Sequence, residues 1–243
     1  MLVLLSCAKT MSAVSKVKVP LTTSPRFQKE AAEIALQMSQ FSVDELERLL
    51  RVNAKIAVEN YKRYQAFHAE ATPELPALLA YTGIVFKRLN PKDFSAEDFG
   101  YAQEHLRLTS FCYGLLRPLD VIRAYRLEGD VVLPELGNQT LFSYWRSRLT
   151  DTFIEDEMKS LFDWKRVESE VRVVTPEFHV WKNGKLATIV VYTKMSRGEM
   201  TRFILKNKIG NPEELKGFSW EGFEFDESLS DEKKLVFING MGE

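Results

Sequence analysis

A chain of 243 residues has room for one large or two small domains, and either can bury a sizeable hydrophobic core. With 45% hydrophobic and 28% charged residues, its composition is that of an ordinary soluble globular protein. The formal net charge of −1 excludes a generic polycation, so any binding of nucleic acid must come from local basic patches.

The cysteine content and the hydropathy of the chain bear on its location. Cys7 and Cys112 are too few for a disulfide framework, which fits a reducing compartment. No apolar segment approaches the length that is needed to cross a bilayer. We therefore expect a cytoplasmic protein that makes no use of a membrane.

The N-terminal part of the chain predicts a strand followed by helices. Residues 2–5 form a short apolar run that ends at a serine, as buried strands do. Residues 26–68 are predicted to be helical, and Ser42 and Glu45 have the spacing of a capping box.

A connection and a further helix start come next. The proline-containing stretch at 73–76 predicts a connection, and is a weak candidate for a domain boundary. Ser95 followed by Asp98 indicates a capped helix start, so a helix is expected to begin there. Apolar residues at helical spacing carry this helix toward residue 106.

A helical hairpin in the middle of the chain is the most informative feature of the sequence. The turn is predicted at Tyr113 and Gly114, because glycine permits a tight backbone approach. Pro118 is predicted to open a second helix, since proline is favoured at the first helical position. Together these features predict a helix-hairpin-helix element over about residues 96–125.

Basic side chains surround the predicted turn. The arginines are Arg107, Arg117, Arg123 and Arg126, and the nearest acid is Asp120. Two short helices joined in this way present backbone N–H groups and guanidinium groups that suit the phosphates of DNA. The plainer interpretation is a helix-turn-helix packing unit with a solvated basic face.

Beyond residue 130 the sequence predicts strands as well as helices. Asn183-Gly184 is the strongest short-range signal for a type I′ hairpin, between strands at 171–181 and 186–192. A last strand is predicted at 235–238. Because helices and strands are mixed without βαβ regularity, we expect an α+β fold.

An anion-binding signal follows the predicted hairpin. Ser196 and Glu199 have the spacing of another capping box, for a helix that should end at 207–210. Lys194 and Arg197 would then lie at a helix N-terminus, where the dipole and the free N–H groups favour an anion. The alternative is a well-capped helix with two exposed bases.

Lys9 lies in a polar turn between Ser6 and Thr10, directly after the first predicted strand. A lysine and hydroxyl groups at the end of a strand suggest a phosphate-binding loop. The glycines that let such a loop wrap a phosphate are missing, however, which excludes a nucleotide-binding P-loop. A single lysine in a polar turn is more often simply solvated.

Charge is segregated along the chain. The first 29 residues carry five bases and no acid, and residues 194–208 carry five bases against one acid. Residues 211–232, by contrast, carry eight acids and one lysine. The fold either gathers these stretches into a basic and an acidic face or leaves each as solvated surface.

Metal binding and nucleophilic catalysis find little support in the sequence. His68, His105 and His179 are far apart, and none has ligand spacing with another His or Cys. Both cysteines are better interpreted as small buried residues than as reactive thiols. We expect no metal site and no cofactor.

Seven short motifs occur in the same order as in the family of the bacterial peroxide-stress protein YaaA. In chain order they are Ser6-x-Ala8-Lys9-Thr10, Phe94-Ser95-x-x-Asp98-Phe99, Gln103-x-His105-Leu106-Arg107, Tyr113-Gly114-x-Leu116-Arg117-Pro118-Leu119-Asp120, Tyr125-Arg126-Leu127-Glu128, Lys194-x-x-Arg197-Gly198 and Phe218-x-x-x-Gly222-x-x-Phe225-Asp226. The chain therefore resembles this family from Leu2 to Ile238. One departure is that relatives carry a longer segment before the equivalent of Glu157.

The resemblance implies a single compact α+β domain over residues 1–243, with a mixed sheet surrounded by helices and a basic cleft. Members of the family are linked to survival of hydrogen peroxide, through limiting free intracellular iron and protecting DNA. We therefore expect a monomer that binds double-stranded or structured DNA. An iron-sequestering protein is disfavoured, because no oxygen-rich or Cys/His ligand set is evident.

Carried over by position, the residues expected to contact DNA come from the hairpin and from the cleft. They are Lys9, Arg107, Tyr113, Gly114, Leu116, Arg117, Lys194 and Arg197. The alternative is an enzyme that acts in the same cleft on damaged DNA or on a nucleotide-like small molecule. Lys9 or Lys194 would then be the nucleophile or acid, and Glu128 or Asp120 the base.

Overall fold

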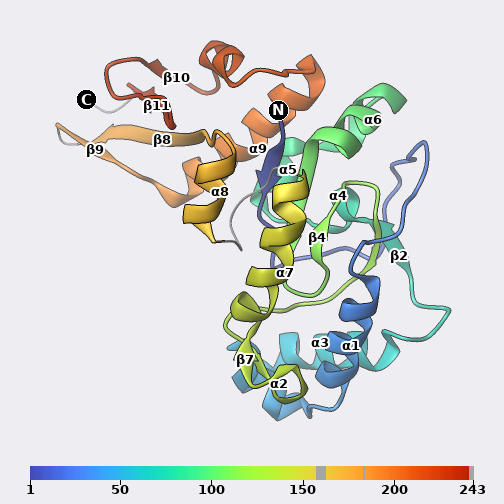
Figure 1. Cartoon of the computed structure of the whole chain (residues 1–243). Helices are drawn as coiled ribbons and strands as arrows, with labels where there is room; N and C mark the ends of the chain where they lie inside the picture. The colour runs from blue at the N-terminus through green and yellow to red at the C-terminus, as the bar shows by residue number, and fades with distance from the viewer. Residues whose placement is uncertain (157–162, 183, 241–243) are drawn as a thin grey trace.

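The computed structural model describes residues 1–156, 163–182 and 184–240 (Figure 1). Its helices are α1 (Gln28–Ser39), α2 (Val43–Leu50), α3 (Ala54–Ala66), α4 (Ala77–Ala80), α5 (Ile84–Leu89), α6 (Ala96–His105), α7 (Leu141–Asp156), α8 (Trp164–Glu170) and α9 (Val190–Asn207), with the 3-10 turns η1 (Pro91–Asp93), η2 (Pro134–Leu136) and η3 (Pro212–Gly217). Its strands are β1 (Val3–Leu5), β2 (Glu74–Pro76), β3 (Leu106–Ser110), β4 (Gly114–Leu116), β5 (Val121–Arg123), β6 (Val132–Leu133), β7 (Gln139–Thr140), β8 (Thr175–Lys182), β9 (Lys185–Ala187), β10 (Phe223–Asp226) and β11 (Lys234–Asn239).

Two of the predicted helix caps are confirmed. At the start of α2, Ser42 Oγ accepts a hydrogen bond from the Glu45 N–H (3.3 Å), and Glu45 Oε2 accepts one from the Ser42 N–H (2.8 Å). At the start of α6, Ser95 and Asp98 make the same reciprocal pair, at 3.1 and 2.9 Å. In both helices the local sequence determines the first residue, because the cap satisfies N–H groups that have no partner within the helix.

Two main sheets give the fold its class. In the first, with strand order β1-β3-β4, β1 runs parallel to β3 and β4 runs antiparallel to it. In the second, with order β10-β11-β8-β9, β11 is parallel to β8 and antiparallel to β10. Helices pack around both sheets, as Figure 1 shows, and the expected α+β fold is confirmed.

The predicted hairpin between β8 and β9 is present. Lys182 lies opposite Lys185, so a connection of two residues joins the strands. Gly184 has a φ of +71°, which a type I′ turn requires at this position. Asn183, the other residue of the turn, lies outside the described residues. The strand at 234–239 confirms the last predicted strand.

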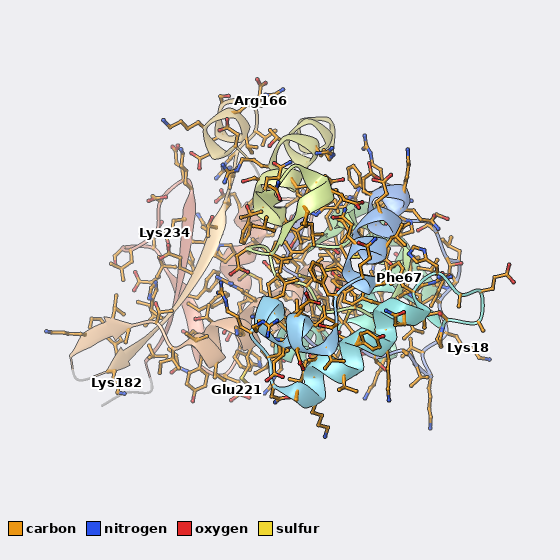
Figure 2. The ribbon with its side chains drawn as sticks, turned by 90° about the horizontal axis from the view of Figure 1, so that it is seen from below. Lys18, Phe67, Arg166, Lys182, Glu221 and Lys234 are labelled. Atoms are coloured by element: carbon orange, nitrogen blue, oxygen red, sulfur yellow. The ribbon has the colours of Figure 1, made fainter. Side chains whose placement is uncertain are left out.

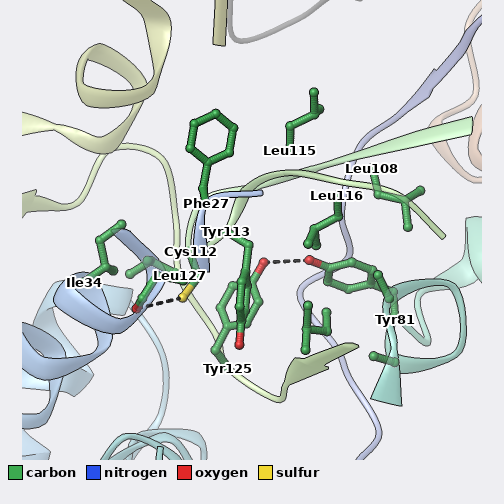
Figure 3. Close-up of a cluster of buried hydrophobic side chains, with 14 of the residues drawn as sticks. Phe27, Ile34, Tyr81, Leu108, Cys112, Tyr113, Leu115, Leu116, Tyr125 and Leu127 are labelled. Atoms are coloured by element: carbon green, nitrogen blue, oxygen red, sulfur yellow. Dashed lines mark hydrogen bonds between the residues drawn. The ribbon is translucent and has the colours of Figure 1, made fainter. Parts of the chain in front are cut away.

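Two hydrophobic clusters fill the interior of a single compact domain. The first surrounds β3 and β4 and includes the fully buried Trp145, and Figure 3 shows part of it. The second lies against the sheet of β8, β10 and β11 and includes Phe237. α9 lies between them, because Leu205 belongs to the first cluster and Ile204 to the second.

Close contacts fix α9 against α5 and α6. Gly198 lies so near α5 that a Cβ there would stand 2.3 Å from the Val85 carbonyl oxygen. At the other end of α9, the Asp98 carboxylate accepts hydrogen bonds from Lys206 Nζ (2.8 Å) and from Lys208 Nζ. Within the described residues, no helix has the length and apolar character of a membrane span.

The predicted helix-hairpin-helix element is wrong beyond His105. α6 supplies the first helix, but it ends at His105 and is followed by β3, β4 and β5. Instead of opening a helix, Pro118 lies in a turn that is closed by a hydrogen bond from the Arg117 N–H to Asp120 Oδ2 (2.7 Å). The apolar run of β3 pairs with β1, and such pairing with a distant segment overrides the local helical preference.

The start of α9 also differs from the prediction. The helix begins at Val190, so the stretch from Val190 to Tyr192 is helical and not part of a strand. Ser196 is therefore buried within the helix and caps nothing. As a result, Lys194 and Arg197 do not lie at a helix N-terminus, and the anion site predicted from that position is wrong.

Candidate functional site

A pocket of about 340 Å³ opens beside Lys9. The loop after β1 forms one side, with Ser6, Cys7 and Lys9. The segment 125–128 after β5 forms the opposite side, and the rings of Phe111 and Phe142 are part of its lining. The pocket therefore joins two of the motifs that are separated by more than a hundred residues in sequence.

The loop that carries Lys9 is fixed against the start of α5. The Thr82 N–H donates to the Thr10 carbonyl (2.9 Å), and the Ser12 N–H donates to the Ala80 carbonyl (2.8 Å). A Cβ on Gly83 would stand 2.7 Å from the Ala8 Cβ, so only glycine lets the two segments approach this closely. Backbone contacts thus place Lys9 at the pocket.

Three charged groups meet at the pocket. Lys9 Nζ lies 2.8 Å from Glu128 Oε2, and Arg126 Nη2 lies 3.3 Å from Glu128 Oε1. The Lys9 side chain is 66% exposed, whereas that of Glu128 is only 18% exposed. Within the described residues, the buried Nε of Arg126 has no hydrogen-bond acceptor. The three groups together carry a net positive charge.

An aromatic wall completes the pocket. The Phe111 and Phe142 rings meet edge to face, with centroids 5.1 Å apart. Gly129 makes this possible, because a Cβ there would stand 2.5 Å from both rings. Phe142 is 44% exposed, so it presents ring surface to solvent at the pocket.

Both cysteines are expected to react slowly in the folded protein. Burial raises the pKa of Cys7 to about 11, and the negative charge of Glu128 adds to the rise; burial also raises the pKa of Cys112. Since the thiolate is the reactive form, we expect iodoacetamide at pH 7.5 to label either thiol at least about tenfold more slowly than an unperturbed cysteine. Mass spectrometry of the protein with and without urea measures this, and equal rates in the two conditions would contradict it.

The residues predicted at the tip of the hairpin lie in the core. Tyr113, Gly114 and Leu116 are buried, and Figure 3 shows Tyr113 and Leu116 within the first cluster. The Tyr113 hydroxyl accepts a hydrogen bond from the Arg123 N–H (3.0 Å). Gly114 has a φ of +67°, and a Cβ there would stand 2.6 Å from the Trp145 ring. In this structure these residues contact protein and not solvent.

The polar residues near this turn also have partners within the protein. Arg107 donates to the carbonyl groups at the end of α6, including that of Gln103 (3.0 Å). Asp120 accepts hydrogen bonds from Thr23 Oγ1 (2.6 Å) and from the Arg117 N–H. Burial raises the pKa of the Asp120 carboxyl, and these hydrogen bonds oppose the rise. Asp120 thus stabilises the turn and does not line the pocket.

The basic stretch 194–208 divides into paired and unpaired bases. Arg202 forms an ion pair with Asp93, while Lys206 and Lys208 share Asp98. Lys194 and Arg197 are exposed on α9, and no ion pair forms at either within the part of the chain that the structure describes. These two bases are therefore available to a ligand.

Two exposed lysines that the sequence reasoning missed lie shortly before Lys194 in the chain. Lys182 and Lys185 are exposed at the end of the β8–β9 hairpin, and Figure 2 shows Lys182 at the outer edge of the molecule. From residue 178 to residue 198 the chain has no Asp or Glu. We call Lys182, Lys185, Lys194 and Arg197 the acid-free surface, because the segment 178–198 that carries them has no acid of its own; Glu177 borders this segment, with its Oε2 3.1 Å from His179 Nε2. The absence of Asp and Glu from residues 178–198 was a signal in the sequence that could have identified these four cations.

The other missed residues belong to the pocket. Phe111 and Phe142 belong to none of the motifs, and Arg126, although it lies in the motif at 125–128, was not predicted as a site residue. In the three described segments, no cluster of three or more His, Cys, Asp or Glu side chains could hold a metal ion.

The comparisons with known proteins give one family. The family model described as peroxide stress protein YaaA matches residues 1–229. A UPF0246 protein of Bacteroides thetaiotaomicron is 93% identical to the chain, with all of both chains covered, and one of Crocosphaera subtropica is 37% identical over 98% of this chain and all of the relative. The first alignment spans 257 positions against 243 residues, so the chain lacks positions that this relative has. The chain belongs to the peroxide stress protein YaaA family, and so to a bacterial family of the oxidative-stress response.

Proposed function

We propose that the protein binds double-stranded or structured DNA in the cytoplasm, as a monomer, during the response to hydrogen peroxide. The acid-free surface would supply the main phosphate contacts. The exposed Lys9 and Arg117 already have partners within the protein, so they would add weaker contacts. Contacts of this kind hold DNA in place without reading its sequence.

The observation that carries this proposal is the lack of any acid among residues 178–198, together with the exposure of their four cationic side chains. A patch that carries only positively charged side chains attracts the phosphate backbone even when the net charge of the protein is near zero. Each phosphate that a lysine or arginine neutralises releases condensed counterions from DNA, and this release favours binding at low salt.

Fluorescence anisotropy of labelled duplex and branched DNA across a salt series tests the proposal. If four phosphates are contacted, log affinity should fall with log salt at a slope of about −3.6. The double variant Lys194→Glu, Arg197→Glu should bind at least about tenfold more weakly and flatten the slope by about 1.8. The matched control is Lys55→Glu, Lys62→Glu, which reverses two exposed charges on α3. Equal affinities of the two variants would overturn the proposal.

An enzyme that acts in the pocket, on damaged DNA or on a nucleotide-like small molecule, is the second candidate function. The observation that favours it is the 2.8 Å contact between Lys9 and Glu128, which places an amine and a carboxylate, two groups that enzymes use as nucleophile and as general acid or base, at the same pocket. Glu128→Gln keeps every cation, so its affinity for DNA should not fall. If cells that produce this variant nevertheless lose their resistance to peroxide, a reaction is supported; unchanged survival counts against one.

The family resemblance also implies that the protein limits free iron. We infer that this role accompanies protection of DNA and does not come from storage of iron by the protein itself. Titration of the purified protein with ferrous iron under anaerobic conditions tests this. Weak binding without a fixed stoichiometry is expected. Tight binding of a fixed number of iron ions would overturn it.

A further inference from the structure

We propose that the pocket beside Lys9 binds a single unpaired nucleotide, with its base against Phe142 and its phosphate at Lys9. The volume of about 340 Å³ suits a ligand of this size, because small-molecule sites begin at about 300 Å³. The pocket contains none of the four cations of the acid-free surface and shares only Lys9 with the residues proposed to contact duplex DNA, so this inference does not rest on the binding of duplex DNA.

The base-binding part of the proposal rests on the aromatic wall. Phe142 is the second residue of α7, and its N–H donates to the Gly129 carbonyl (2.9 Å), which fixes the backbone beneath the ring. The ring itself is 44% exposed, so part of its surface is open to a ligand. A planar heterocycle can stack on such a ring whatever its sequence context, as bases do on aromatic side chains in single-strand binding proteins.

The phosphate-binding part rests on the charges. Lys9 and Arg126 outweigh Glu128 by one positive charge, and the Lys9 amine is free to move because its side chain is 66% exposed. Arg126 pairs with Glu128 at 3.3 Å but keeps donor capacity, since its Nη1 lies 3.5 Å from the Lys9 carbonyl and its Nε has no acceptor among the described residues. An incoming phosphate would therefore take Lys9 from Glu128 and give the guanidinium a further acceptor.

Glu128 gives the site its selectivity for a nucleotide over a simple anion. Its carboxylate accepts hydrogen bonds, so once Lys9 turns to the phosphate it can bind the amino group of a base or a sugar hydroxyl. Cys7 borders the same space as a neutral thiol and adds no repulsion toward an anion. The ligand that satisfies every group is planar, carries N–H or O–H donors and has a phosphate.

Two sources supply this chemistry: free nucleoside monophosphates, and an unpaired nucleotide within a DNA strand. Isothermal titration with AMP, GMP, CMP and TMP tests the first source. Fluorescence of a single-stranded oligonucleotide that contains 2-aminopurine tests the second, because stacking on Phe142 in the pocket would change its emission. Binding in either arm supports the inference and identifies the source. Binding in neither arm overturns it.

Substitutions distinguish the base-binding part of the pocket from its phosphate-binding part. Phe142→Ala should weaken binding of nucleoside and nucleotide alike, by at least about tenfold. Lys9→Gln should weaken binding of the monophosphate but leave that of the nucleoside unchanged. Leu36→Ala, which shortens a 53% exposed side chain of α1, is the control for loss of exposed apolar surface. Binding that survives Phe142→Ala would overturn the assignment.

The acid-free surface variant separates this inference from the proposed function. Lys194→Glu, Arg197→Glu should lose affinity for duplex DNA and keep its affinity for the nucleotide. A protein that binds nucleotides but no duplex would refute the DNA-binding proposal and leave the pocket assignment intact. Loss of nucleotide binding in this variant, with its fold unchanged, would overturn the pocket assignment.

Discussion

Replacing Gly198 by alanine is expected to lower the free energy of unfolding by about 3 kcal/mol. A Cβ at this position would stand 2.3 Å from the Val85 carbonyl oxygen and 2.7 Å from the Arg88 Cβ. The first of these atoms belongs to the backbone of α5, so the clash can be relieved only by moving one helix away from the other. Because α9 contacts both hydrophobic clusters, that movement would loosen the packing of the whole domain.

Gly100→Ala is the matched control for this change. Gly100 lies within α6, and a Cβ there would meet nothing within 4 Å. Alanine should therefore stabilise the protein by about 0.5–1 kcal/mol, through its better helix propensity. Urea denaturation followed by circular dichroism measures both variants. A Gly198→Ala protein as stable as the wild type would show that the contact between the helices is not tight.

Replacing Asp98 by asparagine is expected to cost about 2–3 kcal/mol of stability at pH 7. Asp98 is 5% exposed, and its carboxylate accepts from Lys206 Nζ, Lys208 Nζ and the Ser95 N–H. Asparagine keeps the shape but loses the charge, so two ammonium groups lose their carboxylate and keep only the carbonyl acceptors of Asp93 and Leu205. The change would also weaken the connection between α6 and α9.

The effect of Asp98→Asn should depend on pH. Burial alone would raise the pKa of Asp98, but the hydrogen bonds from the two lysines and from the Ser95 N–H outweigh it and hold the pKa well below its usual value. The carboxylate therefore contributes stability that is fully present above the pKa of the unfolded chain, about 3.9, and is lost as the pH falls toward the folded value. The difference between wild type and variant should stay constant above about pH 5 and shrink below it.

The control for the loss of charge at Asp98 is a substitution of its exposed neighbour, Glu97. Glu97→Gln removes an acid from the same first turn of α6, where only the helix dipole is affected. The expected loss is less than about 1 kcal/mol. Thermal unfolding between pH 3 and pH 7 compares the two variants, and an Asp98→Asn effect that grows on acidification would contradict the assignment.

The elements that the sequence predicted correctly are those whose signals are local. Both capping boxes, at Ser42 and at Ser95, satisfy backbone groups within three residues of the cap. The Asn183-Gly184 turn likewise depends on the backbone freedom of its own residues. Such signals can be recognised without knowledge of the rest of the fold.

The elements that the sequence mispredicted depend on distant partners. β3 is a strand because β1 lies beside it, and the region around Pro118 is a turn because Asp120 holds Arg117 and Thr23. The start of α9 has the sequence of a strand because valine and isoleucine favour strands, yet Val190 to Tyr192 begin the helix that packs against α5 farther along, at Gly198. Neither partner can be identified from spacing alone.

The candidate site was predictable in part, for the same reason. The motifs identified Lys9 and Glu128, and the structure brings them together. The basic stretch 194–208 suggested five available cations, but three of these are neutralised by Asp93 and Asp98, which lie about a hundred residues earlier. Phe142 becomes part of the site only because Gly129 makes room for its ring.

The strand order of the second sheet has a consequence for the order in which the protein matures on the ribosome. β8 and β9 are synthesised well before β11, yet β11 lies between β8 and β10 and pairs with both. Until residues 234–239 have emerged, the hairpin that carries Lys182 and Lys185 has no inner neighbour, while all strands of the β1-β3-β4 sheet are already available. Domains generally fold as units, and the second sheet of this one cannot be completed before β11 is available. The nascent chain would thus fix the hairpin of Lys182 and Lys185 only late in its synthesis.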